Sequence, residues 1–257
     1  MKRILRYSDG TVRYGLLEDD GTIRPLVGSP FEGLATGGPA THVDRVQILA
    51  PVEPRAVYGA GLNYVKHAQE VNLPLPKVPM LFMKPPGTVI GPGSPIVLPR
   101  EGGVVHFEAE VAVVIGRTIR RASEAEAIDA ILGYTCGNDV SERVIQRQEM
   151  DQGCLVVGKG YDSFNPLGPA IATGLDPWDI TILGRVNGEL RQSSNTNDLV
   201  YSIAALIAHL SRAATLRPGD VIMTGTPAGV GPIQPGDVVE IEIPEVGVLR
   251  NPVVAEE

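Results

Sequence analysis

Residues 104–115, Val-Val-His-Phe-Glu-Ala-Glu-Val-Ala-Val-Val-Ile, decide how this chain of 257 residues folds. The last five of these residues, 111–115, are an unbroken run of valine, alanine and isoleucine, which is typical of a strand buried on both faces. Two carboxylates, Glu108 and Glu110, enter this run two positions apart and so share one face of the strand with His106. The stretch therefore predicts a central strand with an acidic site at its beginning.

The chain around this strand is predicted to be mainly β with some α. Residues 180–186 and 238–243 are further strand candidates, whereas helical features are confined to 63–71, 123–132 and 199–213. The second of these helices begins with a capping box, Ser-Glu-Ala-Glu, and should end at a glycine. Because the helices do not alternate regularly with the strands, a parallel βαβ sheet is disfavoured.

Residues 1–50 are predicted to form a small N-terminal β-domain, followed by a main domain over residues 51–257. Short strand candidates, separated by Ser-Asp-Gly and Asp-Asp-Gly turn signals, lie at 4–7, 12–16 and 22–26. The glycine-rich stretch 33–40 is expected to be the linker between the two domains.

Charge and composition exclude several classes of partner. The chain carries 22 Lys and Arg against 30 Asp and Glu, a formal charge of −8, without a basic run. Nucleic acid and anionic membranes are therefore not expected as partners. Its apolar runs are strand-sized, and the basic start is not followed by a signal-peptide segment. Cys136 and Cys154 lack metal or redox spacing and are expected to be buried, reduced thiols of a cytoplasmic protein.

The two glutamates allow two interpretations. Burying two like charges costs desolvation and repulsion, which a hard divalent cation such as Mg²⁺ would offset. On this motif alone, an alternating Glu-x-Glu is more typical of a solvated strand edge. Asp139, beside a predicted strand end and turn, adds a third acid and favours the metal site without excluding the alternative.

Two further segments have a functional and an ordinary interpretation. His67 and Glu70 lie three residues apart on a short predicted helix, where a His–carboxylate pair can act as a general base or form a surface ion pair. The small-residue loop 224–231 can bring N–H groups and a hydroxyl close to an anion, or can be a simple hairpin connection.

Several separated motifs, taken together and in this order, resemble the fumarylacetoacetate hydrolase family. They are Gly61-Leu62-Asn63-Tyr64 with His67 and Glu70, Phe82-Met83-Lys84-Pro85-Pro86, Phe107-Glu108-Ala109-Glu110, Gly133-Tyr134 through Asn138-Asp139-Val140-Ser141, Gly158-Lys159-Gly160-Tyr161-Asp162, Leu167-Gly168-Pro169, Val186-Asn187-Gly188-Glu189, and Pro218-Gly219-Asp220 through Thr224-Gly225-Thr226-Pro227. They cover residues 55–254. Residues 1–50 resemble the small N-terminal domain of some bacterial and archaeal members. The resemblance implies a mixed β-sandwich roll, assembled as a homodimer.

The resemblance also implies a site. By position, Glu108, Glu110 and Asp139 would bind Mg²⁺ or Mn²⁺. The catalytic residues would be His67 with Glu70, which move a proton, and Lys159, which lies at the oxo group of the substrate. Substrate-binding residues would be Gln146, Arg143, Thr226 and Lys84.

The implied substrates are small 2-oxo or enol acids, often dicarboxylates, which react through an enolate stabilised by the metal. We expect hydrolytic C–C cleavage of an acylpyruvate, because His67 and Glu70 could activate water. The close alternatives, from aromatic catabolism, are isomerisation of 2-hydroxyhepta-2,4-diene-1,7-dioate and decarboxylation of 5-oxopent-3-ene-1,2,5-tricarboxylate or oxaloacetate. A non-catalytic, metal-dependent small-acid binding protein is a remote alternative. Residues 71–78 and 148–157 are expected to form a mobile lid.

Overall fold

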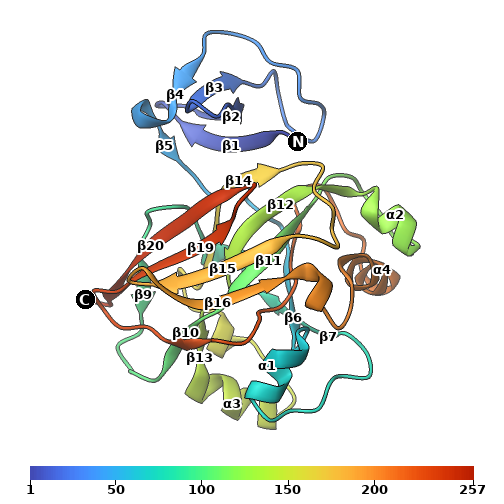
Figure 1. Ribbon diagram of the computed structural model, residues 1–257, viewed down its shortest axis with the longest axis vertical. Helices are drawn as coiled ribbons and strands as arrows, with labels where there is room; N and C mark the ends of the chain where they lie inside the picture. Colours follow the sequence, from blue (N-terminus) through green and yellow to red (C-terminus); the bar gives the residue numbers. More distant parts are fainter.

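The computed structural model describes all residues, 1–257, and consists mostly of strands. Five strands form the N-terminal unit: β1 (Arg3–Ser8), β2 (Val12–Leu17), β3 (Thr22–Pro25), β4 (Thr41–His42) and β5 (Gln47–Ile48). In Figure 1 this unit lies at one end of the long axis of the molecule, and the helices α1 (Val65–Glu70) and α3 (Arg143–Asp151) lie at the opposite end. The strands predicted at 4–7, 12–16 and 22–26 are confirmed.

The largest sheet joins the N-terminal unit to the rest of the chain. Its order is β4-β3-β2-β1-β14-β12-β11-β17-β6-β7, with β5 paired to β1 and β8 (Val89–Ile90) to β14. The central strands are β14 (Asn165–Ala172), β12 (Ile131–Asn138), β11 (Ala109–Ile115), β17 (Val221–Met223), β6 (Val57–Gly61) and β7 (Met80–Lys84). Along the main path only β17 and β6 run parallel, so the expectation against a regular βαβ sheet is confirmed.

A second sheet packs against the first, as Figure 1 shows for β15, β19 and β20. Its order is β16 (Glu189–Asn195), β15 (Thr181–Val186), β19 (Val238–Ile243), β20 (Gly247–Ala255) and β9 (Ile96–Leu98). A small third sheet contains β13 (Ser141–Glu142), β10 (Val105–Phe107) and β18 (Gly231–Pro232). The other helical segments are α2 (Glu124–Ile128), α4 (Ile203–Ala213), and the 3-10 turns η1 (Val43–Arg45), η2 (Pro86–Thr88), η3 (Val157–Lys159) and η4 (Thr196–Asp198).

Strand β11 is buried at all seven positions because a hydrophobic core lies on each of its faces. Val111 and Val113 belong to the larger core, between the two main sheets, whereas Ala112 and Val114 belong to a smaller core on the other face. Since side chains alternate along a strand, Glu110 has the same orientation as Ala112 and Val114. The strand therefore directs this carboxylate away from the larger core.

Two helix predictions need correction, and one helix was missed. Helix α2 has the predicted capping box but ends at Ile128, because β12 already begins at Ile131. Helix α4 begins at Ile203 with Ser202 as its N-cap, since residues 196–198 form a 3-10 turn. Helix α3 was not predicted at all. None of its residues is buried, and only three of its nine residues, Val144, Ile145 and Met150, are apolar, too few to mark a helix in the sequence.

Two other predictions are wrong. Residues 33–40 do not link the N-terminal unit to the rest of the chain but lie within that unit, between β3 and β4. There the N–H of Val27 donates to the carbonyl of Ala35 at 2.8 Å and that of Gly37 to the carbonyl of Pro25 at 2.9 Å. Cys154 is exposed, whereas Cys136 is buried as expected. No helix is both long and apolar enough to cross a membrane.

Candidate active site

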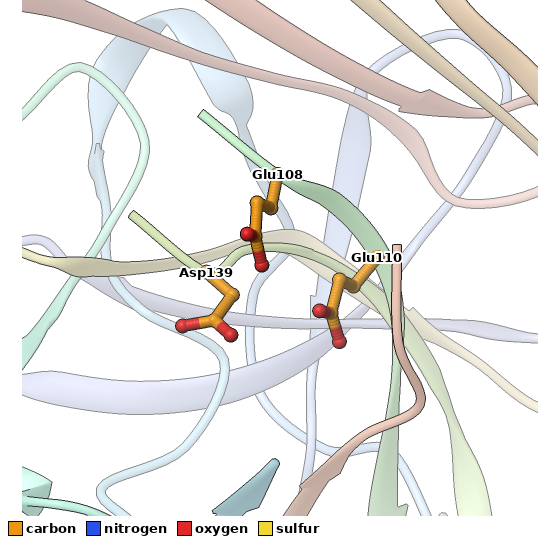
Figure 2. A group of neighbouring side chains, drawn as sticks. All are labelled: Glu108, Glu110 and Asp139. Atoms are coloured by element: carbon orange, nitrogen blue, oxygen red, sulfur yellow. The ribbon is translucent and has the colours of Figure 1, made fainter. Parts of the chain in front are cut away.

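Three carboxylates from neighbouring strands converge at the start of β11 (Figure 2). Glu110 is the second residue of β11, Glu108 lies between β10 and β11, and Asp139 directly follows β12. One ligand atom from each of the three lies within 4.8 Å of the others. We call Glu108, Glu110 and Asp139 the acidic triad.

The polypeptide between β10 and β11 is held in place by the adjacent strand end. The N–H of Glu108 donates to the side-chain oxygen of Asn138 at 3.0 Å, and the N–H of Asp139 donates to the carbonyl of Glu108 at 3.0 Å. The single strand predicted over 104–115 is therefore divided at Glu108. These two bonds place the first and third members of the acidic triad side by side.

The donor set of the acidic triad fits a hard divalent cation. All ligand atoms are carboxylate oxygens, which Mg²⁺ and Mn²⁺ prefer. Burial raises the pKa of Glu110 well above its ordinary range, and the charges of Asp139 and Glu108 raise it further. A cation among the three would relieve this repulsion. The three residues are at most 4% exposed, so the interpretation as a solvated strand edge is wrong.

Cationic side chains compensate two of the three acids. Lys159 Nζ donates to Glu108 at 2.9 Å and also to Asp139, and Arg143 forms a 2.6 Å ion pair with Glu108. Lys84 contacts the other oxygen of Asp139. Burial would raise the pKa of Glu108, but Lys159 and Arg143 hold it below its ordinary value. Burial alone would lower the pKa of Lys159. The negative charges of Asp139 and Glu108 outweigh burial and raise this pKa above its ordinary value.

Of the three carboxylates, Glu110 is the one whose charge is least compensated by neighbouring positive charges. The N–H of Gly225, in the small-residue loop 224–231, donates to its Oε2 at 2.8 Å. This bond lowers the pKa of Glu110 less than burial and the two neighbouring carboxylates raise it. The structure therefore brings together all three predicted ligands, and Glu110 is the one of them that no lysine or arginine pairs with. A cation bound to the triad would offset its repulsion with the other two carboxylates.

A cavity of about 740 Å³ opens over the acidic triad, a size that suits a small molecule. Its lining includes the triad, Lys159, His67, Arg143, Gln146 and Thr226. Both segments predicted to form a lid border it, residues 71–78 through Val71 and Leu73, and residues 148–157 through Met150 and Leu155. Closure of this lid stays a prediction.

His67 is a buried group at the wall of this cavity, whereas its partner Glu70 is exposed. Its Nδ1 lies 3.0 Å from Glu70 Oε2, and the N–H of Gly229 donates to Glu70 Oε1 at 2.9 Å. Because an ionised carboxylate can only accept, Nδ1 of His67 carries the proton. The orientation fixed by Glu70 leaves Nε2 as the basic nitrogen.

The four predicted substrate contacts are placed differently. Arg143 and Gln146 both line the cavity, and the guanidinium donates to the amide oxygen at 2.8 Å. Thr226 also lines it, but its hydroxyl donates to the carbonyl of Ala109 at 3.0 Å and is therefore not free to donate to a substrate. Lys84 is fully buried and does not belong to the cavity lining. Its substrate contact stays a prediction without a geometric basis.

His106 lines the same cavity, in agreement with its predicted position on the face of the two glutamates. Burial lowers the pKa of His106 to about 4, and Arg143 contributes to the lowering. The imidazole is therefore neutral near pH 7 and adds no positive charge to the site.

Gln192 of β16 supports the site and was missed in the sequence. Its buried amide oxygen accepts from the N–H of Ala109 at 2.8 Å, and its nitrogen donates to Thr226 Oγ1 and the Pro227 carbonyl, both at 2.7 Å. Since Ala109 separates the two glutamates of the acidic triad, this amide ties their strand to the loop 224–231. A single glutamine in a polar edge strand gives no motif or periodicity by which to find it.

Comparison with known proteins shows the family of this chain. A family model described as the fumarylacetoacetate (FAA) hydrolase C-terminal domain matches residues 56–254. The chain belongs to the fumarylacetoacetate hydrolase family. A second model, the Rv2993c-like N-terminal domain, matches residues 2–51 of this family member. The predicted family and the mainly β fold class are thus confirmed.

Relatives of this fumarylacetoacetate hydrolase family member carry names of different reactions. A 5-carboxymethyl-2-hydroxymuconate delta-isomerase of Mycobacterium smegmatis is 41% identical with a TM-score of 0.92, covering 99% of this chain and 100% of its own. A fumarylacetoacetate hydrolase of Exiguobacterium antarcticum is 34% identical with a TM-score of 0.86, covering all of both chains. A mitochondrial oxaloacetate tautomerase of Xenopus laevis is 44% identical over 81% of this chain and 69% of its own.

Proposed function

We propose that this protein is a metal-dependent enzyme that tautomerises or isomerises small 2-oxo or enol acids through an enolate. The observation that carries the proposal is the position of a buried acidic triad, the ammonium of Lys159 and the basic nitrogen of His67 in the lining of one cavity. Such a cavity can stabilise negative charge on a substrate and move a proton next to it.

The acidic triad would hold Mg²⁺ or Mn²⁺ through its carboxylate oxygens. When bound, the ion would supply Lewis-acid stabilisation of negative charge on a 2-oxo acid. Lys159 adds a fixed positive charge in the same wall of the cavity, where burial strengthens its attraction for a developing negative charge.

His67 would act as the base that transfers the proton. Its Nε2 would remove a proton from the carbon next to the oxo group and return it to oxygen or to a carbon further along the substrate. Glu70 stabilises the imidazolium formed in between, because one of its oxygens faces Nδ1 and the other is fixed by Gly229. For proton transfer, tautomerisation and double-bond isomerisation need no acid or base beyond this pair.

Two of the relatives support proton transfer as the reaction, since they are named as an isomerase and an oxaloacetate tautomerase. Hydrolytic C–C cleavage of an acylpyruvate is the second candidate. It is favoured by the same His67–Glu70 pair, which could activate water, and by the relative named fumarylacetoacetate hydrolase.

Proton NMR in deuterated buffer with Mg²⁺-loaded protein distinguishes these reactions. We expect faster conversion between the enol and keto forms of oxaloacetate, or a shifted double bond in a hydroxydienedioate, with deuterium entering the carbon next to the oxo group. Release of two acids from an acylpyruvate would instead support hydrolysis. Metal-dependent binding of these acids without conversion of any would overturn the enzymatic proposal in favour of a small-acid binding protein.

A further inference from the structure

The turn that carries Lys159 is attached to α3 by the carboxylate of Glu149, which has no part in the proposed reaction. The N–H groups of Val156, Val157 and Gly158 donate to the two oxygens of Glu149 at 3.1, 2.8 and 2.9 Å. Consecutive backbone N–H groups that face one anion form a concave binding arrangement. Hydrogen bonds to an ionised acceptor are also stronger than those between neutral groups. Glu149 therefore links α3 directly to the residues that precede Lys159.

Apolar packing contributes little to holding this turn. Val156 and Val157 are 53% and 50% exposed, so their side chains gain little from burial. Gly158 lies directly against α3, where a Cβ atom would come within 2.6 Å of the backbone nitrogen of Gln146. Without the carboxylate, three N–H groups would lose their partner in a turn that has no apolar anchor at these positions.

The charge of Glu149 suits this role. Partial burial opposes ionisation, but the three N–H groups lower the pKa of Glu149 below its ordinary value. The side chain is therefore an anion near pH 7, the form that accepts all three hydrogen bonds.

The position of the Lys159 ammonium depends on the turn. It lies between Glu108, at 2.9 Å, and Asp139, and 5.0 Å from the ring centroid of Phe82. Lys159 directly follows the last of the three bound N–H groups, in the short turn η3. A backbone shift of about 1 Å at this point would separate the ammonium from both carboxylates, and misplacements of this size reduce catalysis strongly.

We propose that Glu149 is a positioning residue for Lys159: it fixes the turn 156–158 to α3 and so holds the ammonium between Glu108 and Asp139. The catalytic consequence rests on the proposed function, in which Lys159 stabilises negative charge. The positioning itself can be measured on the protein without metal or substrate.

Lysine acylation with acetic anhydride, quantified by mass spectrometry on the native protein, tests the positioning. In Glu149→Ala we expect labelling of Lys159 to rise about tenfold or more, because the turn opens locally. Gln152→Ala is the matched control, since Gln152 is an exposed side chain at the end of the same helix and should leave labelling unchanged. Lys84 is the internal control. It is equally buried but extends from β7, so it should stay protected in both variants.

Two outcomes would overturn the proposal. One is protection of Lys159 that persists in Glu149→Ala. The other is equal labelling of Lys159 and Lys84, which would show that the whole protein is destabilised and not the turn alone. Amide hydrogen exchange checks the same point independently, because residues 156–158 should exchange faster in Glu149→Ala while β11 remains protected.

Oxalate binding to the Mg²⁺-loaded protein, measured by calorimetry, tests the functional consequence. If Glu149 acts through Lys159, Glu149→Ala and Lys159→Ala should each weaken oxalate binding. The variant with both substitutions should bind oxalate no more weakly than Lys159→Ala alone. Fully additive losses would overturn the proposed coupling. Wild-type protein that binds no oxalate would contradict the proposed function, while the labelling result would still decide the role of Glu149.

Discussion

Replacing Glu110 with glutamine tests whether the acidic triad is built for a cation. The amide keeps the size of the side chain, and its oxygen can still accept from the N–H of Gly225. At the 4.8 Å limit within the triad, two unit charges repel by about 3.5 kcal/mol at an effective dielectric constant of about 20. Lys159 offsets part of this repulsion. For the metal-free protein we therefore expect Glu110→Gln to raise the free energy of unfolding by roughly 1–3 kcal/mol.

Thermal unfolding followed by circular dichroism measures this effect. A chain of this size gains about 2–4 °C in melting temperature per kcal/mol. In EDTA the variant should therefore melt several degrees above the wild type. Excess Mg²⁺ or Mn²⁺ should raise the melting temperature of the wild type, because the ion binds only the folded state, and should leave Glu110→Gln nearly unchanged. Glu124→Gln, which removes an exposed acid from α2, is the control and should show neither effect.

The stability difference between Glu110→Gln and the wild type should depend on pH in a defined direction. The pKa of Glu110 is raised in the folded protein. The stability contributed by the neutral acid is therefore fully present below the unfolded-state pKa of about 4.3. It is lost as the pH rises through the folded-state pKa. The advantage of Glu110→Gln in EDTA should thus be absent near pH 4 and grow with increasing pH. A variant that is less stable than the wild type in EDTA at pH 8, or one that keeps the full metal-dependent shift, would refute the reasoning.

Two further predictions concern the surroundings of the triad. His67→Ala should reduce turnover by about 10²–10⁴-fold in steady-state assays and leave the metal-dependent melting shift intact; unchanged turnover would assign the proton transfer to another group. Gln192→Ala should lower the free energy of unfolding in urea by about 1–3 kcal/mol, because it leaves the buried N–H of Ala109 without its partner. A loss no larger than that of the exposed control Gln152→Ala would contradict the supporting role of this amide.

The central strand could be predicted because its physical cause is local. The run from Val111 to Ile115 is apolar at every position, and the structure places a core on each face of β11. The same alternation brought Glu108 and Glu110 to one side. The division of the strand at Glu108 could not be predicted, since it depends on the side chain of Asn138, thirty residues away in the chain.

The third acid and the helices mark the limit of prediction from the sequence. Asp139 joins the acidic triad through the pairing of β11 with β12. Its place beside a predicted strand end suggested a third acid, but residue patterns alone do not specify which strands pair. Helix α3 was missed because only three of its nine residues are apolar, and the structure buries none of its residues. Glu149 and Gln192 act through hydrogen bonds to backbone N–H groups of other segments, and such contacts leave no periodic signal in the sequence.

Calorimetric titration of oxalate into EDTA-treated protein, with and without Mg²⁺, tests the central claim most directly. Oxalate is a planar mimic of the enolate of a 2-oxo acid and requires both a cation at the acidic triad and the charge of Lys159 nearby. We predict binding only when Mg²⁺ or Mn²⁺ is present, and its loss in Glu110→Gln. Equal oxalate binding with and without metal, or no binding in either case, would contradict the assignment of this cavity as a metal-dependent enolate site.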